Sequence, residues 1–212
     1  MINDLQNRLM GYCALLSYRY MNLCVKADPV ALLSAQVMID DNDYPLEQVA
    51  SVAIEDEVTY RFYPIDKNLI PHICKAMLQE HPEFKQNIDG ETLTFTVPPV
   101  DKDRKDALED MVDALYKDCE LRMKADFGVF STKVSIAAIS LPPETQDECK
   151  EELQKTYDGF VQRSGQFKES KMKEIEKAYG LYCEAHEKEE EEKAEKADAE
   201  GLENIFKMTL EN

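Results

Sequence analysis

The 212-residue sequence lacks the short motifs that mark most catalytic and nucleotide-binding sites. It contains no phosphate-binding glycine-rich loop, no dinucleotide-binding fingerprint and no nucleophile elbow. The acidic residues at 40, 41 and 43 resemble the start of a calcium-binding loop, but the glycine and closing glutamate of such a loop do not follow. The three histidines lie far apart, and the six cysteines form no Cys-x-x-Cys pair. We therefore expect no enzymatic activity, no catalytic residue, no metal, no cofactor and no small-molecule substrate.

Positive charge is also scarce. The chain has 25 Lys and Arg against 43 Asp and Glu, a net charge of -18. The acidic excess is not confined to the C-terminal tail, because residues 1–184 are acidic too. Non-specific affinity for nucleic acid comes from Lys and Arg that displace counterions from phosphates. Broad binding to phosphate backbones is therefore excluded, whereas a local basic patch is not.

Long apolar runs are missing as well. No stretch approaches the ~20 residues of a membrane span, and the first residues lack the basic region and apolar core of a signal peptide. The scattered cysteines fall mostly on apolar faces of predicted helices, which indicates reduced, buried thiols. With 43% hydrophobic residues, the chain can fill the core of one or two domains. We expect a cytoplasmic monomer without membrane contact.

The organising feature of the sequence is a long amphipathic helix over residues 98–135, which opens with a double proline. Apolar residues at steps of three and four form one stripe along it. The stripe consists of Leu108, Met111, Val112, Leu115, Cys119, Met123, Phe127, Phe130 and Val134. Phe127 and Phe130 are interpreted as core residues, with contact to a partner as the alternative.

Two more helices are predicted, over residues 3–26 and from Glu144 to about Cys183. The apolar stripe of the last helix contains one step of five, between Phe167 and Met172. Beyond Cys183 the pattern gives way to a charged run. This run is either a solvated helical extension or disorder, with an interaction tail as the functional alternative.

The region between the first two helices has a different texture, in which short strands predominate. We predict strands over 36–39, 48–54, 59–63 and 91–97, a short helical turn over 30–35 and a helix over 68–79 that is capped by Asn68. Asp89-Gly90 predicts a tight turn. Prolines stand at both ends of the region, in Asp28-Pro29 and in Pro98-Pro99.

This order predicts an α+β multi-domain fold: a three-helix bundle with a small inserted β/α/β domain. Residues 1–28 and 100–184 form the bundle, 30–98 the inserted domain and 185–212 an acidic C-terminal extension. The molecule is expected to be L-shaped, because two short strands of chain join the parts as a hinge. The hinge residues are Asp28, Pro29, Pro98 and Pro99.

Five local motifs in this order resemble the ribosome recycling factor family. Residues 26–33 are similar to its Gly-Arg-Ala-Ser-Pro-x-Leu-Leu, and Pro-Leu-Glu-Gln-Val-Ala-Ser at 45–51 is similar to its Pro-Leu-x-Gln-Leu-Ala-Ser. Residues 64–68 fit the family's strand-to-helix region, and residues 89–93 resemble the strand that precedes the family's double proline. Pro98-Pro99 with Asp103-Arg104-Lys105 resembles Pro-Pro-Leu-Thr-Glu-Glu-Arg-Arg-Lys.

The resemblance implies a tRNA-shaped protein without covalent chemistry. Its bundle lies against rRNA of the large ribosomal subunit. Its smaller domain swings about the hinge and works with a translocase GTPase to split the post-termination ribosome. The family's arginine run, Arg-x-x-x-Arg-Asn-x-Arg-Arg-Asp, falls on residues 120–129 of this chain.

That run departs from the family here. Glu120, Phe127 and Gly128 stand at three arginine positions, and Lys124 keeps only a charge at the fourth. Three lost contacts of about 1 kcal/mol each would weaken binding about a hundredfold or more. The remaining rRNA-contact candidates, which are otherwise ordinary solvated charges, are Lys26, Arg104, Lys105, Lys117, Arg122, Lys124 and Lys133. The sequence thus supports a diverged recycling factor with a weakened rRNA patch, or a protein-interaction module with the same fold.

Overall fold

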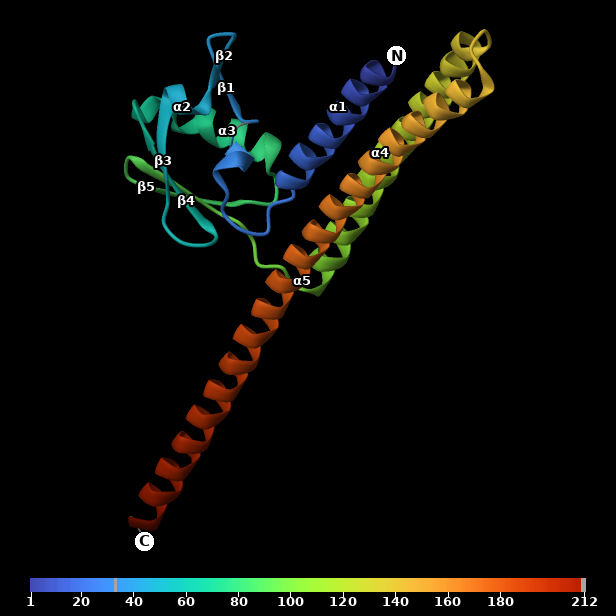
Figure 1. Ribbon diagram of the computed structural model, residues 1–212. Helices are drawn as coiled ribbons and strands as arrows, with labels where there is room; N and C mark the ends of the chain where they lie inside the picture. Colours follow the sequence, from blue (N-terminus) through green and yellow to red (C-terminus); the bar gives the residue numbers. More distant parts are fainter. Residues whose placement is uncertain (33, 211–212) are drawn as a thin grey trace.

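A computed structural model describes residues 1–32 and 34–210, with side chains up to residue 188. Three helices form an elongated bundle: α1 (Ile2–Met21), α4 (Lys102–Ala138) and α5 (Pro143–Leu210). The remaining elements fold into a small α+β unit beside one end of the bundle, and α5 continues past this unit (Figure 1). The predicted L-shaped α+β architecture is confirmed.

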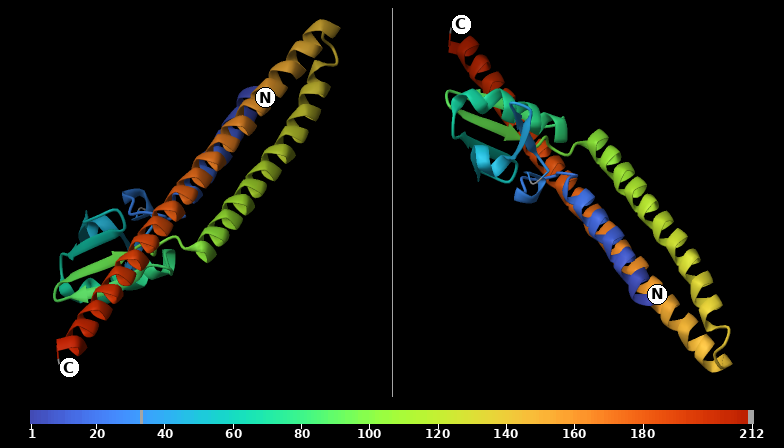
Figure 2. Two further views of the ribbon diagram at one scale, coloured as in Figure 1. Left: turned by 90° about the horizontal axis from the view of Figure 1, so that it is seen from below. Right: turned by 90° about the horizontal axis from the view of Figure 1, so that it is seen from above.

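A side-chain cap marks the start of helix α4. The carboxylate of Asp101 accepts a hydrogen bond from the backbone N of Arg104 at 2.9 Å, which satisfies one of the free donors at the helix start. The predicted stripe faces the other helices, except that Met111 is 44% exposed. Two further views show α4 running alongside α1 and α5, which overlap when seen from these sides (Figure 2).

The bundle has its own core, which runs along the three helices. Its buried residues are Leu5, Leu9, Cys13, Leu16, Tyr20, Val25, Val100, Leu108, Val112, Cys119, Met123, Phe130, Val134, Leu153 and Ile175. Tyrosine hydroxyls tie α1 to α4 at its edges: Tyr12 donates to Asp126 Oδ2 at 2.8 Å, and Tyr20 donates to the Val112 carbonyl at 3.0 Å. The contacts set the register of α1 against α4.

The α+β unit contains a four-stranded antiparallel sheet in the order β3-β4-β6-β5 and a separate hairpin of β1 and β2. Its elements are a 3-10 turn η1 (Pro29–Leu32), β1 (Gln36–Ile39), β2 (Asn42–Pro45), α2 (Leu46–Val49), β3 (Ala50–Ile54), β4 (Thr59–Pro64), η2 (Lys67–Leu69), α3 (Ile70–Glu80), β5 (Lys85–Asp89) and β6 (Thr92–Thr96). The β5–β6 connection uses the predicted turn, where Gly90 has a φ of 61°. The core of the unit contains an aromatic cluster: the ring of Phe62 lies edge-on to Phe95 at 5.2 Å, and Tyr60 stacks on Phe84 at 5.9 Å.

Several sequence predictions are corrected by the structure. Helix α1 ends at Met21 rather than at 26, because Cys24 enters the core of the α+β unit while Val25 stays in that of the bundle. The predicted strand 48–54 begins only at Ala50, after the one-turn helix α2. Asn68 does not cap the next helix: Asp66 caps the 3-10 turn η2 by accepting from the Asn68 backbone N at 2.8 Å, and α3, which begins at Ile70, has no side-chain cap.

Strands β2 and β5 escaped prediction because they carry few apolar residues. Every residue of β5 is exposed, as expected of an edge strand that pairs on one side only. The charged C-terminal run is helical as far as Leu210, and residues 211 and 212 lie outside the described residues. Among the described helices, none combines the length and apolarity that crossing a membrane requires.

Candidate functional site

The hinge consists of two strands of chain, residues 24–28 and 97–100. Both are bonded to the loop between β3 and β4: Ala27 N donates to Glu57 O at 2.7 Å, and Val97 N donates to Val58 O at 2.8 Å. The Tyr60 hydroxyl lies 2.6 Å from Asp28 N and 3.0 Å from Asp28 O. The predicted hinge residue Asp28 is therefore held on the α+β side of the connection.

Arg104 joins the two strands of the hinge. Its Nη2 donates to the Cys24 carbonyl at 2.7 Å, and its Nη1 donates to the Pro98 carbonyl. Burial lowers the pKa of the guanidinium, while the charges of Glu83 and Asp101 act in the opposite direction. The side chain stays protonated because arginine titrates far above neutral pH. Arg104, predicted as an rRNA contact, is thus engaged inside the protein.

A second buried cluster lies behind this contact, at the end of α3. His81 is 2% exposed, donates from Nε2 to the Ala31 carbonyl at 2.9 Å and stacks on Phe84. Its Nδ1 lies 3.6 Å from Glu83 Oε1 and 4.0 Å from Cys24 Sγ. Burial by itself lowers the pKa of His81, but contacts with Cys24, Glu83 and the Ala31 carbonyl outweigh it and raise the pKa to about 10.

Almost nothing in the sequence points to this cluster. His81 and Glu83 follow α3 directly, but Cys24 is 57 residues away from His81 along the chain. No spacing rule connects residues at such a separation. The only local signal was the His81-Pro82 helix end, which predicts the end of α3 but not the burial of the imidazole.

Lys105 connects α4 to α5 next to the hinge. Its Nζ lies 2.9 Å from Glu109 and 3.0 Å from Glu176, and also 5.6 Å from the centre of the Tyr179 ring. Hydrogen bonds to Glu109 and Glu176 raise the pKa of Lys105. Of the predicted rRNA contacts, Arg104 and Lys105 are therefore both committed to contacts within the chain.

The other candidates are spread over exposed positions. Lys26 is exposed at the hinge, and Lys117, Lys124 and Lys133 are exposed along α4. Lys133 lies 5.0 Å from the centre of the Phe130 ring, and Arg122 pairs with Asp118 at 3.0 Å. The structure does not gather these side chains into one dense basic site.

The outward face of α4 is more apolar than the sequence analysis predicted. Leu121, Val129, Ile136 and Ile139 are between 50% and 72% exposed. They follow one another at steps of eight, seven and three, on the side opposite the core stripe, and this pattern was overlooked because charged residues interrupt it. Phe130 is buried and Phe127 packs on Tyr157 at 4.4 Å, which supports their interpretation as core residues.

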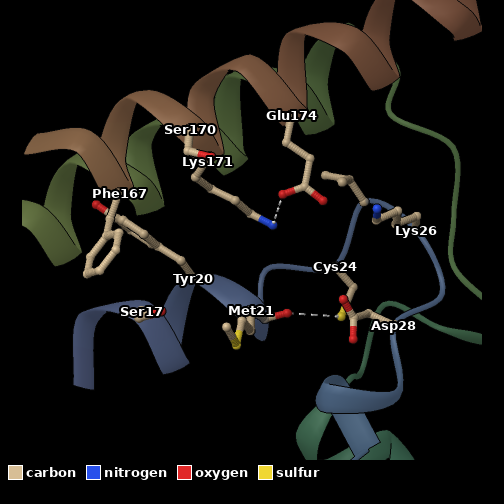
Figure 3. Close-up of a pocket in the computed structure, with 11 residues that line it drawn as sticks. Ser17, Tyr20, Met21, Cys24, Lys26, Asp28, Phe167, Ser170, Lys171 and Glu174 are labelled. Carbon is tan, nitrogen blue, oxygen red and sulfur yellow. Dashed lines mark hydrogen bonds and ion pairs between the residues drawn. The ribbon is translucent and has the colours of Figure 1, made fainter. Parts of the chain in front are cut away.

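Two hollows flank the hinge. A cavity of about 160 Å³ lies between the end of α1 and α5, where Lys171 Nζ pairs with Glu174 at 2.9 Å (Figure 3). Lys171 is 7% exposed. A groove of about 900 Å³ separates the β3–β4 loop, at Ile54 and Val58, from Leu181 and Tyr182 of α5. In the described part of the chain, no group of three or more His, Cys, Asp or Glu side chains is arranged to hold a metal.

Comparison with known proteins gives a consistent result. A family model described as ribosome recycling factor matches residues 21–176. The ribosome-recycling factor of Parabacteroides distasonis is 26% identical over 152 residues, covering 71% of this chain and 81% of its own. That of Christiangramia forsetii is 30% identical over 134 residues, covering 62% and 73%.

Solved structures show the same fold. A solution structure of the ribosome recycling factor superposes with a TM-score of 0.66 at 17% identity, covering 83% of this chain and 97% of that one. A model of the T. thermophilus ribosome recycling factor and E. coli elongation factor G bound to the E. coli post-termination complex gives 0.54 at 23% identity, covering 82% and 98%. The fold of this chain is thus the one that these structures share.

Proposed function

The chain belongs to the ribosome recycling factor family, and from this premise we propose that it binds the post-termination ribosome and assists release of the subunits. The protein does no covalent chemistry of its own and acts in the cytoplasm as a monomer. Its partners are the rRNA of the large subunit and a translocase GTPase. The last proposal is supported by the relative whose structure is described together with elongation factor G on the post-termination complex.

The observation that carries this proposal is the division of the buried side chains into two cores joined by two strands of chain. We take residues 1–28 with 100–184 as the body that docks on the ribosome and 30–98 as the body that swings. Asp28, Pro29, Pro98 and Pro99 flank the pivot. We take residues 185–212 as an acidic C-terminal extension, which is helical as far as Leu210 and lies beyond the segment that the family model matches.

Co-sedimentation with purified bacterial large ribosomal subunits over a series of salt concentrations tests the proposal. Binding should be measurable at low salt and weaken as salt rises, since the remaining contacts are ionic. Replacing Lys117, Lys124 and Lys133 by Glu should abolish it. Replacing Lys67, Lys75 and Lys85, which are exposed on the α+β unit, is the charge-matched control. A protein that stays in the free fraction at low salt contradicts the proposal.

A second candidate function is favoured by the outward face of α4. Exposed Leu121 and Val129 directly follow residues 120 and 128, where the resemblance places arginines of the family, and Ile136 and Ile139 continue the apolar face. A charged rRNA surface gives apolar side chains nothing to pack on. In this alternative the chain is a protein-interaction module that has lost rRNA binding. Replacing Leu121 and Ile136 by Ser would then abolish a stable, RNase-resistant complex, whereas the three Lys→Glu changes would leave it intact.

A further inference from the structure

We propose that Arg104 is the positioning residue of the hinge, a clamp that holds its two strands together so that the α+β unit moves about one pivot. The inference deepens the function proposed above, which requires a swinging unit. It also assigns to Arg104 a role that excludes the rRNA contact predicted from the sequence.

The guanidinium of Arg104 bridges the two strands of the hinge. Arg104 belongs to α4, whereas the carbonyls that it binds, those of Cys24 and Pro98, lie on the incoming and outgoing strands. A planar fork can donate to two acceptors at once, while a lysine ammonium offers a single point of charge. One side chain of the bundle therefore fixes the distance between the two strands of the hinge.

A negatively charged side chain on the other side of the hinge, Glu83, attracts Arg104. Glu83 follows α3 in the α+β unit, and its carboxylate interacts favourably with both His81 and Arg104, which lowers the pKa of Glu83 against the opposing effect of its burial. Asp101 of α4 also attracts the guanidinium. Glu83 thus pairs with His81 at 3.6 Å and attracts Arg104, at the start of α4, through its charge.

Two backbone hydrogen bonds lie next to the carbonyls that Arg104 binds, one on each strand of the hinge. The Ala27 and Val97 amides donate to carbonyls of the β3–β4 loop. Ala27 lies three residues after the bound Cys24 carbonyl on the incoming strand, and Val97 directly precedes Pro98 on the outgoing strand. If Arg104 releases the two carbonyls, nothing holds the two strands at a fixed distance from each other, and these hydrogen bonds should open more often.

Amide hydrogen exchange of the free, full-length protein tests the clamp directly. In Arg104→Gln we expect the Ala27 and Val97 amides to exchange about tenfold faster than in the wild type. Amides of the β4–β6 pairing should keep their wild-type rates and so show that the unit remains folded. Arg104→Lys keeps the charge but loses the fork, and it should loosen the hinge as well. Arg122→Gln, an exposed arginine on the same helix, is the control and should change neither amide.

A second variant keeps the test decisive if Arg104→Gln fails to fold. Glu83→Gln leaves both carbonyl contacts of Arg104 in place and removes a carboxylate charge that attracts Arg104 and pairs with His81, so a smaller acceleration at the same two amides is expected. The clamp is wrong if the hinge amides of Arg104→Lys and Glu83→Gln exchange at wild-type rates.

Ribosome binding separates the clamp from a phosphate contact. If Arg104 bound an rRNA phosphate, its replacement would lower the slope of log affinity against log salt by about one and would leave the exchange of the hinge amides unchanged. The clamp predicts faster hinge exchange and an unchanged slope in Arg104→Gln. If the wild type binds no ribosome, the proposed function fails, while the exchange result still decides the clamp.

Discussion

The two cores of this molecule are built on different plans. The core of the α+β unit gathers aromatic rings, with Tyr60, Phe62 and Phe95 all fully buried, into one small cluster. The bundle core is instead a row of mostly aliphatic side chains, and it accommodates Ser164 at 1% and Lys171 at 7% exposure. A cluster concentrates many contacts on each ring, whereas a row spreads them along the helices. The first core should therefore be sensitive to single substitutions and the second more tolerant.

The largest effect is expected from Phe62→Ala. Removing a fully buried ring that contacts both Tyr60 and Phe95 should destabilise the α+β unit by about 3–5 kcal/mol. Chemical denaturation followed by circular dichroism measures this, with Tyr63→Ala, at a 46% exposed neighbour, as the control. An equal loss in both variants would show that the ring cluster does not dominate this core.

Ile175→Ala tests the row in the bundle. Ile175 is fully buried, and its truncation should cost a free energy of unfolding near the lower end of about 2–5 kcal/mol, because neighbouring helices can close on the gap. The same denaturation experiment applies. Amides of the sheet should retain their exchange rates if the two cores are separate, and a parallel loss of protection there would contradict the comparison.

His81 should make the stability of the α+β unit depend on pH. Its folded pKa of about 10 lies above its ordinary value of 6.5. The contribution is therefore complete below pH 6.5 and is lost as pH rises towards 10. Unfolding midpoints at several pH values should fall over this window in the wild type and less in His81→Gln. His72→Gln, at an exposed histidine, should behave like the wild type.

The smallest effect is expected from Lys171→Met. The substitution removes a nearly buried charge, keeps a similar volume and leaves Glu174 partly in contact with water. Loss of the ion pair and relief from burying the ammonium should nearly cancel, so stability should change by less than about 1 kcal/mol. A loss of 3 kcal/mol or more, the size of effect seen when a buried pair is broken, would show that the row also contains a critical position.

The sequence predicted the parts of the fold that rest on local patterns. The stripe of α4, the Asp89-Gly90 turn and the alternation in β6 are each contained within a few turns or residues, so the periodicity was sufficient. Strand β5 has no apolar periodicity to detect, since all its residues are exposed.

The site was less predictable, because it depends on contacts between distant segments. The Arg104 guanidinium meets the Cys24 carbonyl 80 residues away, and a backbone carbonyl leaves no trace in the residue type. The sequence therefore identified Arg104 as a noteworthy cation but assigned it to a contact with rRNA or, failing that, to solvent. The positions of the prolines predicted where the strands of the hinge run, but not what holds them together.

The clamp also has an evolutionary consequence. Since one side chain reaches the carbonyls of both Cys24 and Pro98, the inserted unit begins and ends at adjacent points. An insert with adjacent ends is a cassette, whose length and content can change without moving α1 relative to α4. The bundle, with a core of its own, can thus serve as a constant frame on which different lineages carry different versions of the swinging part.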